Sequence, residues 1–198
     1  LNLFEGKLGT ASVGLVGDNS YFGIASPTKG HRFRLSGEQY FGDIKLTNLI
    51  ADVRKYFFLK PFTFAVRAMH HGRYGTDANA FYNLFLGYPW YMRGYGFSDS
   101  YEILEKNGRS VDDLFGSKML LANAEVRIPL SGPEQLALLK SRALFTELSF
   151  FTDGGYAWDV FEKPTEGDLT QFDFKPLFSA GVSLRINLFG ALVLEPYY

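Results

Sequence analysis

The sequence is defined first by what it does not contain. Its 198 residues include no cysteine, which excludes disulfides, thiolate metal sites and a cysteine nucleophile. The 20 Lys and Arg residues are balanced by 21 Asp and Glu, for a formal net charge of -1. Because phosphate binding needs a clustered surplus of cations, nucleic acid is not an expected partner. No run of roughly 18 apolar residues occurs, so no transmembrane helix is expected.

Aromatic residues are what the sequence has in excess. They make up 17% of the chain, with 20 Phe and 12 Tyr, whereas the hydrophobic share of 46% is ordinary. Many fall near the ends of predicted strands, where the aromatic girdles of a membrane barrel lie. These residues are Tyr21, Phe22, Tyr40, Phe41, Tyr56, Phe57, Phe58, Trp90, Tyr91, Tyr156, Trp158, Tyr197 and Tyr198.

Apolar and polar residues alternate with a period of two along nearly the whole chain, which predicts an all-β protein with about nine antiparallel strands. The predicted strands are 10–17, 31–41, 45–57, 62–74, 81–90, 121–130, 144–156, 179–188 and 191–198. Three connections are long, at 94–115, 131–142 and 159–176. In the second, a proline followed by helix-forming residues predicts a short amphipathic helix at about 133–140.

The polar face of these strands favours a membrane barrel. It carries long charged side chains such as Arg34, Arg54 and Glu125, and the opposite face is bulky and apolar. In a transmembrane barrel the apolar face meets lipid and the polar face a wet lumen. A soluble barrel with its polar side in water is the alternative, but strands of about 9–14 residues exceed the roughly 5–6 typical of soluble proteins. Since an open sheet leaves unpaired edges in lipid, we expect an antiparallel transmembrane β-barrel that lacks strands on both sides.

Four motifs, in a fixed order, resemble those of the bacterial surface antigen superfamily, the BamA-like outer-membrane assembly and translocation proteins. The first is the Arg-Gly-Tyr triplet in the long loop. The other three lie in the predicted strands that follow it, and the resemblance is clearest over residues 86–198. The motifs are Arg93-Gly94-Tyr95, Asn123–Leu130 with Glu125, the Phe-x-Asp-x-Gly pattern of Phe151, Asp153 and Gly155, and Ser179–Arg185.

The resemblance implies a barrel of roughly sixteen strands in the bacterial outer membrane, of which residues 1–198 form a partial barrel domain without either seam strand. It also implies that a long extracellular loop, at about 91–116, folds back into the lumen. Family members insert or translocate proteins without covalent chemistry, so no enzymatic activity, catalytic residue, cofactor or metal is expected. The expected partners are the lipid bilayer, lipopolysaccharide, and client or partner outer-membrane or secreted proteins.

The residues themselves give the triplet a physical role. Glu125 and Asp153 lie on the polar faces of consecutive predicted strands, about 5 Å apart, and can converge on one cation. The planar fork of Arg93 suits two carboxylates. Gly94 would let the loop backbone approach the wall closely, and Tyr95 is expected to pack on Phe151. We therefore expect Arg93 to hold the loop inside the lumen; an Arg exposed to water is the alternative.

Other combinations of residues point less strongly to a functional site. His70 and His71 are adjacent in a strand and point to opposite faces, which argues against a shared metal. Ser98, His70 and Asp99 have the residue types of a hydrolase but lack a Gly-x-Ser-x-Gly motif. Two further functions stay open, a membrane anchor for a fused hydrolase or propeller domain and a passive pore. The pore is disfavoured because an inward loop would plug it.

Overall fold

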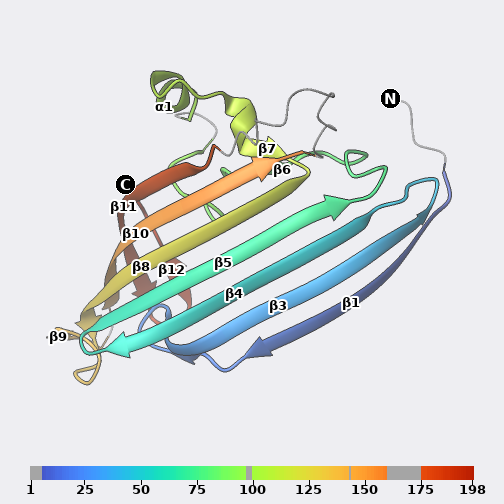
Figure 1. The fold of residues 1–198 in the computed structure, drawn as a ribbon. Helices are drawn as coiled ribbons and strands as arrows, with labels where there is room; N and C mark the ends of the chain where they lie inside the picture. Colours follow the sequence, from blue (N-terminus) through green and yellow to red (C-terminus); the bar gives the residue numbers. More distant parts are fainter. Residues whose placement is uncertain (1–5, 97–99, 143, 160–174) are drawn as a thin grey trace.

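One large curved sheet dominates the computed structural model, which describes residues 6–96, 100–142, 144–159 and 175–198 (Figure 1). Its long strands are β1 (Leu8–Asp18), β3 (Pro27–Gly42), β4 (Thr47–Leu59), β5 (Phe62–Tyr74), β8 (Lys118–Gly132), β10 (Leu144–Trp158) and β11 (Leu177–Leu188). The spatial order is β1-β3-β4-β5-β8-β10-β11-β12, and all of these neighbours are antiparallel. The sheet is not closed, and β1 and β12 are its outer strands.

Short elements occupy the connections. They are β2 (Tyr21–Phe22), β6 (Leu84–Phe85), helix α1 (Ser100–Lys106), the 3-10 turn η1 (Val111–Leu114), β7 (Phe115–Gly116), β9 (Leu139–Lys140) and β12 (Leu192–Leu194). β6 pairs with β7 as a small separate ribbon beside the end of β10 and the start of β8. In the described part of the chain, no helix is long and apolar enough to cross a membrane.

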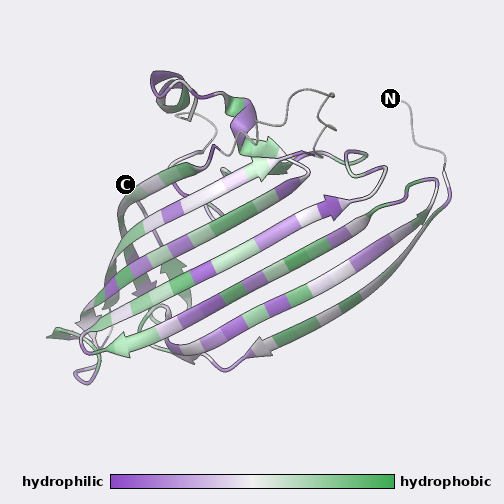
Figure 2. Cartoon of the chain, in the orientation of Figure 1, coloured by the Kyte–Doolittle hydropathy of each residue, from purple (hydrophilic) through white to green (hydrophobic). Residues whose placement is uncertain are grey.

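The two faces of the sheet have opposite character. Hydrophobic and hydrophilic residues alternate along each long strand (Figure 2), because successive side chains of a strand point to opposite faces. On the outer face the side chains are apolar and exposed, as at Val13, which is 77% exposed, and Leu15, which is 61% exposed. On the inner face charged side chains are buried, as at Asp153, which is 1% exposed, and Glu147, which is 2% exposed. This is the reverse of a soluble protein.

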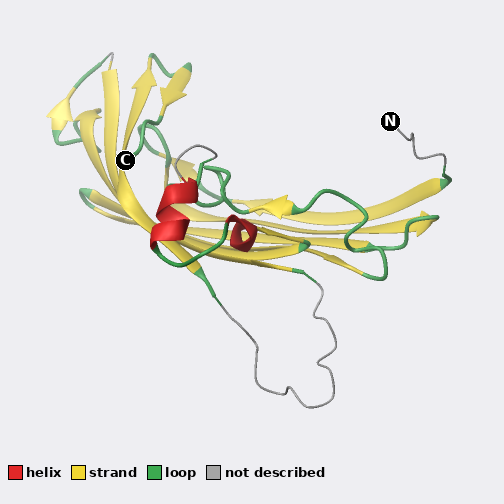
Figure 3. Cartoon of the chain, turned by 90° about the horizontal axis from the view of Figure 1, so that it is seen from above, coloured by secondary structure: helices red, strands yellow, loops and turns green. Residues whose placement is uncertain are grey.

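The sheet curves strongly, so that its inner face is concave (Figure 3). Asn187 on β11 donates a hydrogen bond from Nδ2 to the carbonyl oxygen of Ile24, which lies just before β3, at 2.8 Å. Four strands separate β3 from β11, a span of about 24 Å along a flat sheet. Direct contact across that span is possible because the sheet wraps round.

Most predicted strands are confirmed, and two local predictions are wrong. Residues 81–90 contribute only β6 and then turns, because the aromatic side chains there pack within a loop. Residues 133–140 form one turn, closed by hydrogen bonds to the carbonyl oxygen of Pro133, and then β9 in place of a helix. β9 pairs in parallel with the end of β8, so its backbone groups are satisfied by the sheet.

The predicted girdle is confirmed in part. Tyr21, Phe22 and Phe57 are exposed and lie in or near the ends of strands. Tyr56 instead is buried on the inner face. Trp90 belongs to the connection between β5 and β8, called here the loop, where its ring stacks on Tyr88 with 4.5 Å between centroids. The alternation pattern could not distinguish these inward aromatic residues from the outward ones, because both kinds occur next to turns.

Candidate functional site

The Arg93 guanidinium is clamped between two carboxylates of the inner face. Its Nε and Nη2 donate to the two oxygens of Asp153 on β10, at 2.8 and 2.7 Å, and its Nη1 donates to Oε1 of Glu125 on β8 at 2.7 Å. The backbone N–H of Arg93 also donates to Asp153, at 3.1 Å. A bidentate pair of this kind fixes both the position and the orientation of the guanidinium. The structure thus brings Arg93, Glu125 and Asp153 together.

The Phe151 ring lies against the Arg93 guanidinium. The Arg93 guanidinium carbon lies 3.7 Å from the centroid of the Phe151 ring, which is a cation–π contact. Tyr95 donates from its hydroxyl to the carbonyl oxygen of Phe178 at 2.7 Å. The Phe151 ring thus lies against the planar cation of Arg93, and the expected packing of Tyr95 on Phe151 stays a prediction. Burial raises the pKa of the Tyr95 phenol.

The two motif glycines serve different geometric needs. Gly94 has φ of +86°, a backbone conformation that side chains disfavour, and it turns the chain between Arg93 and Tyr95. Gly155 has an ordinary conformation but stands under Leu86 of the loop. A Cβ added at Gly155 would lie 2.6 Å from Cδ2 of Leu86, so only glycine lets the loop approach β10 this closely.

Side chains of the sheet also donate hydrogen bonds to backbone carbonyl groups of the loop. Arg67 on β5 donates from Nη1 to the carbonyl oxygen of Trp90 at 2.7 Å. Asn123 on β8 donates from Nδ2 both to the carbonyl oxygen of Tyr91, at 2.9 Å, and to Asp153, at 2.8 Å. The strands β5 and β8 therefore hold the residues just before Arg93 through direct hydrogen bonds.

An apolar cluster fills the space between the loop and the upper inner face. It joins loop side chains to side chains of β5, β8, β10 and β11. Its buried members are Met69, Phe85, Leu86, Met92, Tyr95, Leu104, Leu114, Met119, Leu121, Ala157 and Leu177. The loop thus has a hydrophobic core of its own with the sheet, beside the ionic site.

Glu125 is the centre of a wider ionic network. Besides Arg93, it accepts from Nε of Arg127 at 2.7 Å and from Nη2 of Arg185 at 3.1 Å. Arg185 in turn pairs with Glu147 at 3.1 Å and Glu195 at 2.8 Å. Three arginines around one carboxylate would be unbalanced, so the additional acids are needed to neutralise them.

The sequence reasoning did not place Arg127, Arg185, Glu147 or Glu195 in the site. Arg127, Glu147 and Arg185 lie on the charged faces of predicted strands, and Arg185 ends a family motif. The alternation of polar and apolar residues could therefore have placed these three on the inner face. Glu195 carried no comparable signal, because it stands in an apolar segment next to a proline. Only the pairing of the last residues with β11 brings it to Arg185.

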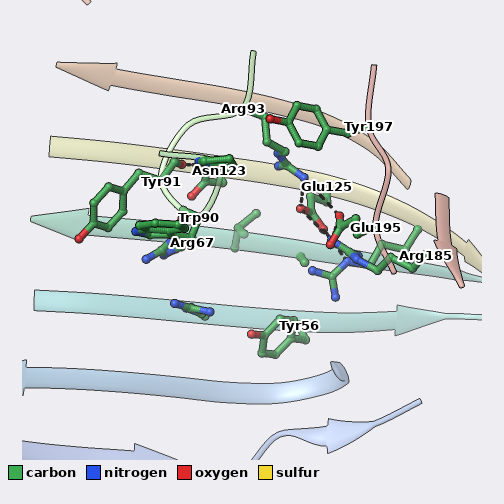
Figure 4. A pocket seen from close by; sticks show the side chains of 15 residues that line it. Tyr56, Arg67, Trp90, Tyr91, Arg93, Asn123, Glu125, Arg185, Glu195 and Tyr197 are labelled. Atoms are coloured by element: carbon green, nitrogen blue, oxygen red, sulfur yellow. Dashed lines mark hydrogen bonds and ion pairs between the residues drawn. The ribbon is translucent and has the colours of Figure 1, made fainter. Parts of the chain in front are cut away.

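A cavity of about 440 Å³ lies between the loop, the network and β4–β5. In Figure 4, Glu125, Glu195 and Arg185 gather on one side of it, and Trp90 and Arg67 on the other. Arg54 and Arg67 share a single carboxylate, that of Asp52, at 2.8 Å each.

The histidines do not converge on a shared site. Nδ1 of His70 lies 3.0 Å from the carbonyl oxygen of Met119, and Nε2 of His71 lies 3.0 Å from Oδ1 of Asn48. The described ranges contain no group of three or more His, Cys, Asp or Glu residues placed to hold a metal ion. Ser98 and Asp99, considered above with His70, lie outside the described residues.

Chemically, the site consists of saturated ion pairs and hydrogen bonds, an arrangement that holds one segment against another. Comparison with known families supports the interpretation drawn from the motifs. The family model of the Omp85 superfamily domain matches residues 7–194, and no curated protein matches the chain with significant similarity. The superfamily includes outer-membrane protein insertion and translocation factors, and its members are outer-membrane proteins of Gram-negative bacteria, chloroplasts or mitochondria. With nearly its whole length matched, this chain belongs to the Omp85 superfamily.

Proposed function

We propose that this chain is part of a bacterial outer-membrane barrel of the BamA type, which inserts or translocates client proteins. Its outer face meets lipid and lipopolysaccharide, and its inner face encloses the lumen. Clients are outer-membrane or secreted proteins, which would add a strand at a barrel seam through β-augmentation. In this function Arg93, held by Glu125 and Asp153, keeps the loop docked in the lumen, and no covalent chemistry is involved.

The observation that carries the proposal is the buried ion pair between Arg93 and Asp153, which joins the loop to β10. Asp153 accepts three hydrogen bonds from Arg93 and one from Asn123. Removing one partner of a buried pair leaves the other charge uncompensated, at a cost of about 3–5 kcal/mol. Undocking of the loop would leave the Asp153 carboxylate without its cation, which favours the docked position.

The inward and outward polarity of the sheet supports the membrane setting. The exposed outer side chains are bulky and apolar, such as Leu49, Val53 and Phe150, and a water-facing sheet would not carry them. The inner charges need an enclosed polar space, since lipid would leave them unpaired.

The test is client folding by the full-length protein in phospholipid vesicles. An unfolded outer-membrane barrel protein is added, and its folding is followed by the shift in gel mobility of the unheated sample. We expect faster folding than in empty vesicles, and loss of most of that acceleration in Arg93→Ala. The matched control is Arg142→Ala, because Arg142 is an exposed arginine outside the network.

Two outcomes would contradict the proposal. Equal client folding with and without the protein would favour a membrane anchor for a fused domain. A steady open conductance in a planar bilayer would favour a passive pore, because a docked loop should keep the conductance low.

A further inference from the structure

The segment 23–27, called here the inner turn, joins β2 to the first residue of β3 and contacts strands on the far side of the sheet. Ser26 is buried and donates from Oγ to Oε1 of Glu147 on β10 at 2.7 Å. The carbonyl oxygen of Pro27 accepts from Nη1 of Arg127 on β8 at 3.0 Å. Ile24 is also buried, and its carbonyl oxygen accepts from Asn187 on β11. Three strands of the far side thus hold this one turn.

The inner turn and the Arg93 loop sit at opposite ends of the strands. The loop connects the end of β5 to the start of β8, and the inner turn lies where β1 ends and β3 begins (Figure 1). On β10, Glu147 near the start of the strand contacts the inner turn, and Asp153 further along contacts Arg93. The ionic network occupies the space between these two contacts.

Glu125 connects the inner turn to Arg93 through two chains of contacts, and a longer ion pair of 4.0 Å between Arg93 and Glu195, the partner of Arg185, runs beside them. In the first, Arg127 binds the carbonyl oxygen of Pro27 and, through Nε, Oε2 of Glu125. In the second, Glu147 binds Arg185, and Arg185 binds Glu125 at 3.1 Å. The other oxygen of Glu125 accepts from Arg93 at 2.7 Å.

The position of Glu125 therefore depends on both ends. Its carboxylate accepts hydrogen bonds from Arg127 and Arg185 as well as from Arg93. Buried charges have few alternative partners, so releasing one contact shifts the rest of the network. In the enclosed setting an arginine that loses its partner must reorganise or become hydrated.

We propose that the inner turn positions the Arg93 site, so that Ser26 and the Pro27 carbonyl oxygen act through Arg127, Arg185 and Glu147 on the docking of the loop. Opening of the inner turn at one end of the lumen favours undocking of the loop at the other end. The inference rests on the docked loop of the proposed function, and not on client folding.

The absence of cysteine allows single-cysteine reporters in the full-length protein in lipid vesicles. Met92 is fully buried beside Arg93, so the rate of maleimide labelling of Met92→Cys measures undocking of the loop. In that background Ser26→Ala should raise the rate about fivefold, the lower end of typical coupling between sites. Ser20→Ala is the matched control, because the Ser20 hydroxyl bonds only to the exposed Asp18 among the described partners, and its rate should stay unchanged.

A third reporter separates coupling from general loosening. Leu46 is buried between β3 and β4, outside the network, and Leu46→Cys should label at the same rate with and without Ser26→Ala. The coupling must also be reciprocal: with an Ile24→Cys reporter in the inner turn, Arg93→Lys should raise labelling by a similar factor.

The outcomes distinguish the two proposals. If Arg93→Lys does not accelerate labelling of Met92→Cys, the docked loop itself is wrong. If it does, but Ser26→Ala leaves that rate unchanged, the docked loop stands and the inner turn is not a positioning element. Equal acceleration at Leu46→Cys would likewise overturn the positioning role, since it would show that the whole sheet has loosened.

Discussion

The inner face holds its loop by two different means in two neighbouring regions. Near the ends of β5 and β8 the contact is apolar, with Leu86, Met92 and Leu114 packed on Met119 and Leu121. Further down the strands it is ionic and centred on Glu125. The apolar region gains stability from burial of area and tolerates small shifts. The ionic region depends on direction, because a guanidinium and a carboxylate bind well only in a few arrangements. The apolar region therefore holds the loop against the sheet, and the ionic region sets the position of the loop.

The largest effect is expected from reversing a charge in the ionic region. Asp153→Arg places two cations against each other in a buried site, and we expect a loss of about 3–5 kcal/mol in the free energy of unfolding. Urea unfolding of the full-length protein in lipid vesicles measures it. Asp112→Arg is a control at an exposed acid in η1. A stability of Asp153→Arg equal to that of the control would show that the pair does not hold the loop.

An intermediate effect is expected in the apolar region. Leu114 is fully buried, so Leu114→Ala should reduce stability by about 3 kcal/mol, through lost burial and the cavity left behind. The same unfolding measurement applies, with the exposed Leu138→Ala as control. Unlike the charge reversal, this variant should keep Arg93 docked, so labelling of an Ile24→Cys reporter should not change. A large rise in that labelling would mean that the two regions are not separate.

The smallest effect is expected at Gly155, where β10 and the loop meet. Gly155→Ala adds a Cβ that would lie 2.6 Å from Leu86, and overpacking of this kind costs about 1–3 kcal/mol. Because the added Cβ would meet the Leu86 side chain, Leu86→Ala should relieve part of this cost. The double variant should therefore lose less unfolding free energy than the sum of the two single variants. Strict additivity in unfolding experiments would place the strain elsewhere.

Strand positions were predictable because alternation is a local property. The predictions at 144–156 and 179–188 agree closely with β10 and β11. Residues 81–90 were assigned wrongly because an aromatic run satisfies a strand pattern whether it pairs with a neighbour or packs in a loop. The turn near Pro133 was mistaken for a helix because local propensity was overridden by pairing with the edge of β8.

The site was predictable where a motif pointed to it, and not where distant segments meet. Arg93, Glu125 and Asp153 followed from the family motifs and strand faces. The contact between Ser26 and Glu147 joins residues 121 positions apart, and no pattern within either segment indicates it. Likewise, whether Tyr95 or Arg93 would take the Phe151 ring depends on side-chain geometry that spacing does not specify.

The β6–β7 ribbon has a consequence for how the loop is assembled. Leu84 pairs with Gly116 and Phe85 with Phe115, so the two arms of the loop are joined a few residues before Arg93. Once the two arms are joined, the flexible chain between Arg93 and the nearest paired residue is shorter than it is when only β5 and β8 are paired. Arg93 lies 8 residues from Phe85 and 19 from Tyr74, and closing a tether roughly twofold shorter costs about 0.6 kcal/mol less in chain entropy. If the ribbon forms first, it therefore lowers the entropic cost of forming the ion pair.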